Sequence, residues 1–231
     1  MRAIQMVDLF NQYNDIKAEI DSAISTVIDT STFINGPQVE LFTQKLANYL
    51  GAKHIIPCAN GTEALHIALM SLNLKPRDEV IVPDFTFIAP VEAIALSGLM
   101  PVLVDVNPDT FTIDINNVKK AITPRTRAII PVHLFGQAAE MEELSPICKD
   151  NDIYIIEDNA QSLGADYIFS NGKRQKLGTI GDIGCTSFFP SKNLGCFGDG
   201  GAVFTNNENL ANTIHRLVNH GSMVKYHHDI I

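Results

Sequence analysis

The sequence is short of positive charge and contains no tryptophan. Lys and Arg total 17 against 26 Asp and Glu, which gives a formal net charge of -9. A surface that follows nucleic-acid or membrane phosphates needs clustered Lys and Arg, so neither is expected as the main partner. No stretch approaches the roughly 18 uncharged apolar residues of a membrane span, and the opening residues contain no signal-peptide core. These absences predict a soluble, cytoplasmic protein.

Cysteine is also sparse, and its spacing excludes two common roles. None of the four cysteines, Cys58, Cys148, Cys185 and Cys196, forms a CxxC pair, and none has a zinc-type histidine pattern near it. The Tyr-His-His run at 226–228 lacks carboxylate or cysteine partners at metal-ligand spacing. The sequence therefore predicts free thiols in a reducing compartment and no metal site.

The sequence does contain enough hydrophobic residues for a sizeable core, in segments that alternate between strand-like and helix-like patterns. Of its 231 residues, 45% are hydrophobic. Mostly continuous apolar segments predict strands buried on both faces, at 54–58, 79–83, 101–106, 127–134, 153–158, 185–189 and 202–205. Helical patterns precede and separate them, at 14–29, 37–51, 61–74, 89–99, 139–151 and 207–219. This alternation predicts an α/β three-layer sandwich with a mainly parallel seven-stranded sheet. The length alone allows one large domain or two small ones.

Polar residues follow several of these strands, at the edge where open parallel sheets bind ligands. The first group is ANGTEAL at 59–65, in which Gly61 opens a helix after strand 54–58. The backbone N–H groups of Gly61 and Thr62, with the Thr62 hydroxyl, would form an anion site at the helix N-terminus. The structural alternative is that Thr62 is only the helix N-cap.

The second group is EDNAQ at 157–161. Glu157 and Asp158 end a buried strand, and Gln161 lies three residues after Asp158. A carboxylate at this position either caps the next helix or holds a cation or a protonated ring nitrogen. Gln161 is close enough to face the same pocket, and the residues alone leave both roles of Asp158 open.

The third group is SFFPSKNLG at 187–195, which places Lys192 five residues after Ser187. A lysine whose charged form is disfavoured by apolar surroundings can act as a nucleophile or form a Schiff base. The nucleotide patterns GxxxxGK[ST] and GxGxxG are both absent, which disfavours a lysine that binds nucleotide phosphates. The structural alternative is a surface lysine on a glycine-rich loop.

Two aromatic residues and a histidine near strand ends are further candidates. Phe85 and Phe87 follow strand 79–83, where core packing is the default but an aromatic ring can also stack on a flat ligand. His133 has the pattern of a hydrogen-bonded core histidine rather than of a catalyst.

One ligand would use these groups together, because pyridoxal 5'-phosphate has a phosphate, a flat ring, a ring nitrogen and an aldehyde. Gly61, Thr62 and Ser187 suit the phosphate, and Phe87 suits the flat ring. Asp158 suits the ring nitrogen, and Lys192 suits the aldehyde. The combination therefore predicts a pyridoxal 5'-phosphate site.

With these motifs the chain resembles the DegT/DnrJ/EryC1/StrS family of sugar aminotransferases, which have fold type I of the pyridoxal-phosphate enzymes. The similarity spans nearly the whole chain. The matching stretches are FINGPQVELFTQKLANYLGAKH (33–54), ANGTEAL (59–65), DEVIVPDFTF (78–87), PVHLFGQ (131–137), IEDNAQSLGA (156–165), SFFPSKNLGCFGDGGA (187–202), NHG (219–221) and KYHH (225–228).

The resemblance implies a role for each site residue. Lys192 would hold the cofactor as a Schiff base and then move the proton between substrate carbon and cofactor. Asp158 would keep the pyridine nitrogen protonated, so that the ring accepts electrons from the substrate. Gln161 would hydrogen-bond the cofactor's 3'-oxygen, and Phe87 would stack on the ring, where many family members have Tyr or Trp.

The resemblance also implies the reaction and the assembly. Glutamate would give the amino group, and a keto group on a nucleotide-linked sugar would receive it. The opening FINGPQV and the ending KYHH look closest to members that make 3-amino uronic acids from UDP-2-acetamido-3-keto sugars for cell-surface polysaccharide; dTDP-3-keto and 4-keto sugars are the alternatives. Family members are homodimers that share their sites, here expected to involve the loop around Lys192 and residues 215–231.

Two further expectations concern differences from an active family member. A GxNxRxD segment, whose Asn reaches the neighbouring subunit's cofactor phosphate, and a small C-terminal domain would normally follow residue 228. The resemblance therefore implies that residues 1–231 are an N-terminal segment plus the large cofactor-binding domain, and that the small domain is missing. The alternative from another class is a non-enzymatic regulator on the same fold, which would not need the complete set Asp158, Gln161, Ser187 and Lys192.

Overall fold

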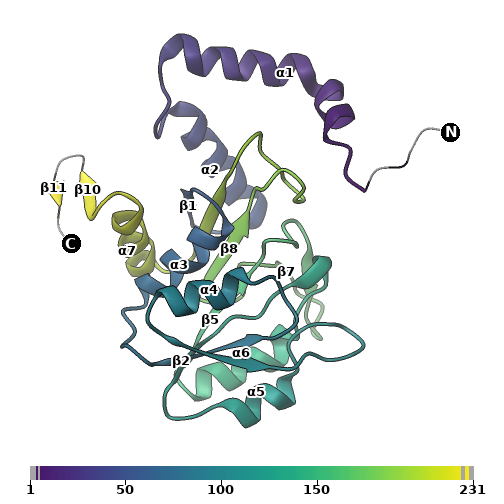
Figure 1. Cartoon of the computed structure of the whole chain (residues 1–231), viewed down its shortest axis with the longest axis vertical. Coiled ribbons are helices and arrows are strands. Elements are labelled where there is room, and N and C mark those ends of the chain that lie inside the picture. The colour runs from purple at the N-terminus through teal and green to yellow at the C-terminus, as the bar shows by residue number, and fades with distance from the viewer. Residues whose placement is uncertain (1–3, 5, 225–226, 229–231) are drawn as a thin grey trace.

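A seven-stranded sheet forms the centre of the molecule (Figure 1). The computed structural model describes residues 4, 6–224 and 227–228. In the order β1-β9-β8-β5-β4-β2-β3, the sheet contains β1 (His54–Cys58), β9 (Gly201–Thr205), β8 (Ile183–Ser187), β5 (Tyr154–Asp158), β4 (Thr126–Ile129), β2 (Glu79–Pro83) and β3 (Met100–Val104). All strands but β9 point the same way, since β9 pairs antiparallel with β1 on one side and β8 on the other. The predicted mainly parallel seven-stranded sheet is confirmed.

Helices cover both faces of this sheet. One layer contains α3 (Gly61–Ser71), α4 (Ala89–Leu96) and α7 (Glu208–Val218); the other contains α2 (Pro37–Leu50), α5 (Ile115–Ala121) and α6 (Met141–Asp150). Successive side chains of a strand point to opposite faces. Val80 and Val82 accordingly pack in the cluster with α3 and α4, whereas Ile81 packs with α5 and α6. All three are fully buried, and the predicted three-layer sandwich is confirmed.

The first helix, α1 (Leu9–Thr30), contributes nothing to the core. None of its residues is buried, and Figure 1 shows it standing apart from the sheet layers. Its Tyr13 ring meets the Phe197 ring edge-on, with centroids 5.6 Å apart. The helix begins earlier than the predicted range 14–29 because Asp8 caps it, accepting the Asn11 N–H at 3.2 Å.

The predicted strand 127–134 is wrong after Ile129. Ile130 still donates its N–H to the Ile81 carbonyl at 2.8 Å, but Pro131 has no N–H to continue the ladder. Val132 makes only an isolated bridge to Asp158, and a 3-10 helix follows at Leu134–Gly136. The proline therefore ends the strand and lets the chain turn at the edge of the sheet.

The other elements differ from the predictions mainly in where they begin and end. The strand predicted at 185–189 begins earlier and stops at Ser187, and the helix predicted at 61–74 stops at Ser71. Elements that the sequence did not predict are α5 and four short strands, β6 (Asp166–Ile168), β7 (Arg174–Lys176), β10 (Ser222–Val224) and β11 (His227–His228). Such short strands lack the apolar run that marks a core strand.

The structure also bears on the expectations about membrane spans and cysteines. Across the described ranges, no helix is both long and apolar enough to cross a membrane. The four cysteines are free thiols, as predicted. Of the Tyr-His-His run, Tyr226 lies outside the described residues.

Candidate active site

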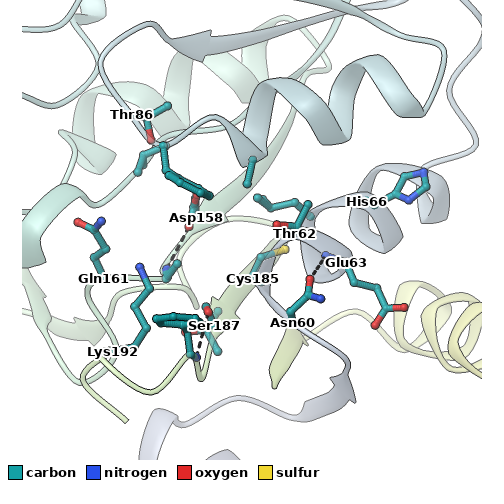
Figure 2. A pocket seen from close by; sticks show the side chains of 18 of the residues that line it. Asn60, Thr62, Glu63, His66, Thr86, Asp158, Gln161, Cys185, Ser187 and Lys192 are labelled. Carbon is teal, nitrogen blue, oxygen red and sulfur yellow. Dashed lines mark hydrogen bonds between the residues drawn. The ribbon is translucent and has the colours of Figure 1, made fainter. Parts of the chain in front are cut away.

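The carboxyl ends of β1, β2, β5 and β8 lie at one edge of the sheet, because these strands point the same way. A cavity of about 750 Å3 opens at this edge, a size typical of small-molecule sites. All seven residues predicted for the site line it, namely Gly61, Thr62, Phe87, Asp158, Gln161, Ser187 and Lys192. Figure 2 shows five of them labelled around the cavity. The fold therefore brings together the residues that the sequence predicted for one site.

The N-terminus of α3 supplies the anion-binding end of the cavity. Asn60 is the N-cap, and its side-chain oxygen accepts the Glu63 N–H at 2.9 Å. The alternative that Thr62 is the N-cap is therefore wrong. The Ala64 N–H binds the Asn60 carbonyl at 3.0 Å, so Gly61 and Thr62 have the first N–H groups without a helical acceptor. The Thr62 hydroxyl faces the same cavity (Figure 2).

Ser187 adds a hydroxyl to this end because Gly61 has no side chain. A Cβ atom at position 61 would lie 2.7 Å from the Ser187 Cβ, closer than such atoms ever approach. The Ser187 Oγ accepts the Phe189 N–H at 3.2 Å, which leaves its proton for a ligand. Two backbone N–H groups and two hydroxyls thus form a cradle for a phosphate-sized anion.

Asp158 lies at the end of β5 and lines the same cavity. Its backbone is fixed on both sides, with its N–H bound to the Pro131 carbonyl at 2.9 Å and its carbonyl bound by the His133 N–H at 3.0 Å. The Oδ1 atom accepts the Ala160 N–H at 3.0 Å, so Oδ2 is the oxygen left for a ligand.

Burial raises the pKa of Asp158 above its ordinary value, since only 6% of the residue is exposed. The Ala160 N–H and then electrostatic interactions with His133 and Lys192 lower this pKa, but they do not outweigh burial. A buried acid of this kind gains most from a cationic partner. Asp158 is therefore suited to a protonated ring nitrogen.

Gln161 presents a hydrogen-bond donor to the cavity. Its Oε1 atom accepts the Phe135 N–H at 2.8 Å, so its Nε2 atom is the group left for a ligand. An amide NH2 matches an acceptor such as a phenolate oxygen. The geometry thus agrees with the contact to a cofactor 3'-oxygen that the resemblance implied.

Lys192 lies on the loop after β8 and lines the same cavity, beside Gln161 (Figure 2). Its N–H binds the Phe189 carbonyl at 2.8 Å. The turn that follows needs a glycine, because a Cβ at Gly195 would lie 2.2 Å from the Pro190 oxygen. The lysine side chain is half-buried and reaches toward Asp158 and Gln161 (Figure 2). The setting is therefore less apolar than the sequence predicted, and the amine faces the cavity rather than bulk solvent.

Of the two phenylalanines after β2, the structure places one in the site. Phe87 lines the cavity and is 69% exposed, so its ring is free to stack on a flat ligand. Phe85 does not line the cavity and packs against Phe111 instead, with ring centroids 5.7 Å apart.

The cavity also includes residues that sequence reasoning missed, among them Asn60, Glu63, His66, Thr86 and Asp199. Asn60 could have been found, because Asn followed three residues later by Glu is an N-cap signal. Asp199 could not, since its Oδ2 accepts the Asn60 amide at 3.1 Å across 139 residues. This contact joins the Lys192 loop to the start of α3.

His133 is the core histidine that the sequence predicted. It is fully buried and hydrogen-bonded to Glu157 at 2.8 Å. Within the part of the chain that the structure describes, no group of three His, Cys, Asp or Glu residues could hold a metal ion.

Several known proteins with the same fold and a similar sequence are named aminotransferases. The model of the DegT/DnrJ/EryC1/StrS aminotransferase family matches residues 14–231. A crystal structure of such an aminotransferase from Brucella abortus superposes with a TM-score of 0.93 at 41% identity, covering 99% of this chain and 62% of that one. The ntda structure from Bacillus subtilis with bound cofactor PMP gives 0.87 at 35% identity, covering 100% of this chain and 52% of that one.

The chain is also similar in sequence to curated proteins. The chain is 48% identical over 225 residues to the UDP-2-acetamido-2-deoxy-3-oxo-D-glucuronate aminotransferase of Pseudomonas aeruginosa. This match covers 97% of this chain and 61% of that protein. It is 45% identical over 228 residues to a pleiotropic regulatory protein of Geobacillus stearothermophilus, which covers 99% of this chain and 60% of that protein.

The fold matches that of the Brucella aminotransferase structure. The chain belongs to the DegT/DnrJ/EryC1/StrS aminotransferase family. It spans 61% and 60% of the length of the two relatives just named.

Proposed function

We propose that the chain is the cofactor-binding part of an aminotransferase that moves an amino group from glutamate to a keto group of a nucleotide-linked sugar by means of pyridoxal 5'-phosphate. Residues 1–231 would then be its N-terminal segment and large domain. The observation that carries the proposal is the convergence of Lys192, Asp158 and Gln161 with an anion cradle on one cavity.

The residues fit each part of the cofactor. The cradle of Gly61, Thr62 and Ser187 offers N–H and hydroxyl donors to a phosphate. Asp158 is a buried acid with a free oxygen, which suits a ring nitrogen that must stay protonated. Together with the Gln161 amide donor, these groups would bind the cofactor at both ends and leave its aldehyde facing Lys192.

The chemistry that pyridoxal phosphate supplies when bound is an electron sink for a carbanion beside a nitrogen. Lys192 Nζ would hold the aldehyde carbon covalently, with the aldehyde oxygen lost as water, and, once an amino donor has displaced the lysine, would move the proton between substrate and cofactor carbons. Asp158 Oδ2 would hold the proton on the ring nitrogen. Phe87 would cover one face of the ring and exclude water from it.

The proposed substrate is a UDP-2-acetamido-3-keto-hexuronate or a similar sugar for cell-surface polysaccharide, because the Pseudomonas relative is named for such a sugar. Aminotransferases for dTDP-3-keto or 4-keto sugars are the alternative within the same reaction. Turnover measured against a panel of keto sugar nucleotides, with glutamate as donor, tests the choice. Activity with the UDP-3-keto uronate well above that with the other sugars is expected.

The second candidate is a regulator without enzymatic activity, since one relative at 45% identity is named a pleiotropic regulatory protein. The complete set of Asp158, Gln161, Ser187 and Lys192 on one cavity favours the enzyme. The purified protein should be yellow, and its absorbance should change when glutamate is added. A protein that is colourless with added cofactor, or unchanged by glutamate, would support the regulator. Four free cysteines suit the cytoplasmic location expected for either.

We expect Gln161→Glu to weaken cofactor binding more than Gln161→Leu. A glutamate side chain at position 161 keeps an acceptor for the Phe135 N–H, but it replaces the amide donor by a negative charge that would face the cofactor's 3'-oxygen. Leucine loses both contacts without adding charge. One hydrogen bond to a charged group contributes about 1.5–3 kcal/mol, so Gln161→Leu should lower affinity about 10- to 100-fold. Absorbance titration of each cofactor-free variant measures this, and the reverse order would contradict the assigned contact.

The proposed enzyme would be a homodimer, and the rim of the cavity supports this. Around the Lys192 loop, Phe189 is 54%, Leu194 43% and Phe197 63% exposed, an apolar surface beside the site. A charge buried there would be costly. Leu194→Glu is therefore expected to raise the dimer dissociation constant about 10-fold or more, the cost of a central interface residue. The neighbouring Asn193→Glu adds the same charge at an exposed polar position. Light scattering over a range of concentrations would compare the two, and equal masses would oppose an interface at this loop.

A further inference from the structure

A buried hydrogen bond between His133 and Glu157 lies next to the candidate site and has no part in the chemistry proposed above. His133 and Glu157 are both fully buried, and the His133 Nε2 and Glu157 Oε2 atoms are 2.8 Å apart. The Ala139 N–H donates to the His133 Nδ1 atom at 3.2 Å. Because Nδ1 accepts, Nε2 carries the ring proton and donates it to Glu157. Neither side chain lines the cavity.

Glu157 also anchors the turn that leads into β8. Its carboxylate accepts backbone N–H groups from Gly178 at 2.8 Å and from Ile180 and Gly181 at 2.6 Å. With His133, four donors converge on one side chain. This side chain therefore joins three segments that are distant in sequence, namely the turn after β4, the end of β5 and residues 178–181.

The joined segments are those that position the cofactor groups. Glu157 and Asp158 are consecutive on β5, so their side chains point to opposite faces. The His133 backbone N–H binds the Asp158 carbonyl at 3.0 Å. On the other side, Asp158 is in register with Cys185 of β8, two residues before Ser187. A shift of the buried network would therefore move Asp158 and Ser187 relative to each other.

We propose that Glu157 and His133 are positioning residues of the cofactor site, which hold β4, β5 and the turn before β8 together so that Asp158 and Ser187 keep the spacing of ring nitrogen and phosphate. The proposal rests on the proposed function, because it assumes that this cavity binds pyridoxal phosphate. Neither residue touches the cofactor.

Glu157→Gln tests the role of the carboxylate, and Asp182→Asn is its matched control. In Glu157→Gln, an NH2 group replaces one oxygen and faces N–H donors, so at least one segment loses its acceptor. Asp182 is also a carboxylate at the β5–β8 boundary and accepts the Ile155 N–H at 2.8 Å, but it does not line the cavity. Both changes remove one charge from the same sheet.

Three measurements on each variant separate positioning from general stability: the melting temperature of the cofactor-free protein, the affinity for pyridoxal phosphate, and the visible spectrum at saturating cofactor. Glu157→Gln should lower the affinity about 10- to 100-fold, the loss typical of removing a support behind a ligand-binding group, and should shift the visible band. Asp182→Asn should leave affinity and spectrum unchanged. A Glu157→Gln protein that melts lower but binds cofactor with parental affinity and spectrum would overturn the proposal.

A second pair of variants keeps the test decisive if Glu157→Gln does not fold. His133→Gln can still donate a hydrogen bond to Glu157, whereas His133→Leu cannot. Rescue of affinity and spectrum by glutamine relative to leucine is expected, and equal behaviour of the two would contradict the proposal. If the parent protein itself binds no pyridoxal phosphate, the proposed function fails; if the parent binds and only the variant contrasts are missing, the positioning role alone fails.

Discussion

Replacing Lys192 by alanine is expected to abolish transamination and to remove the covalent attachment of pyridoxal phosphate. The lysine amine reaches into the cavity toward Asp158 and Gln161 (Figure 2), and of the lysines that the structure describes no other lines it. Loss of a positioned acid–base group alone lowers a rate about 100- to 10,000-fold, and the nucleophile is lost with it. Cofactor should still enter the site, because the cradle and Asp158 remain.

Borohydride reduction followed by peptide mass analysis measures the attachment. In the parent protein, the cofactor mass should be found on the peptide that contains Lys192. Lys176→Ala is the matched control, since Lys176 binds Asp166 at 3.0 Å outside the cavity; it should keep both label and activity. A label on Lys173 or Lys176 in the parent protein would show that the site is assigned to the wrong lysine.

The sheet could be predicted because its strands have a composition that few other elements share. EVIVP at 79–83 is buried at every position, and its continuous apolar run appears as such in the sequence. The end of β4 could not be placed in this way, because Ile130 and Val132 are as buried as strand residues although Pro131 has already stopped the ladder. The β6–β7 hairpin was missed for the opposite reason, since its strands are short and largely polar.

The sequence could predict which residues lie at the site, because they follow strand ends, but it could not predict their contacts. Parallel strands bring their carboxyl ends to one edge, so residues that follow β1, β5 and β8 had to meet. Contacts between distant side chains had no such signal. Asn60 binds Asp199, and His133 binds Glu157 across 24 residues, with no shared motif to connect the partners.

The two consecutive acids of β5 show why the sequence left their roles open. Glu157 and Asp158 are both buried at the end of the same strand. Glu157 accepts from three backbone N–H groups and His133, whereas the carboxylate of Asp158 has one backbone donor, the Ala160 N–H. The acid with filled hydrogen-bond positions holds the fold, and the acid with an open oxygen is the one suited to a ligand. The hydrogen-bond partners that distinguish them are supplied only by the folded chain.

Asp158→Asn is expected to have opposite effects on activity and on the stability of the cofactor-free protein. Asparagine keeps an acceptor for the Ala160 N–H but removes the charge that would hold the ring proton. Removing one partner of a buried ion pair costs about 3–5 kcal/mol, so transamination should fall about 100- to 5,000-fold. Cofactor should still be labelled on Lys192, because the lysine and the cradle are unchanged.

Without cofactor, the same substitution should stabilise the protein near neutral pH. Burial raises the pKa of Asp158 above its ordinary value of 3.8, so the folded protein holds this proton to higher pH than the unfolded chain does. The stability that Asp158 contributes is thus full below about pH 4 and is lost as pH rises through the raised pKa. The melting temperature of cofactor-free Asp158→Asn should therefore exceed that of the parent at pH 7, by a margin that shrinks as pH falls toward 4. Near-parental activity would reduce Asp158 to a structural acid, and a lower melting temperature at pH 7 would contradict an acid whose charge is unfavourably buried.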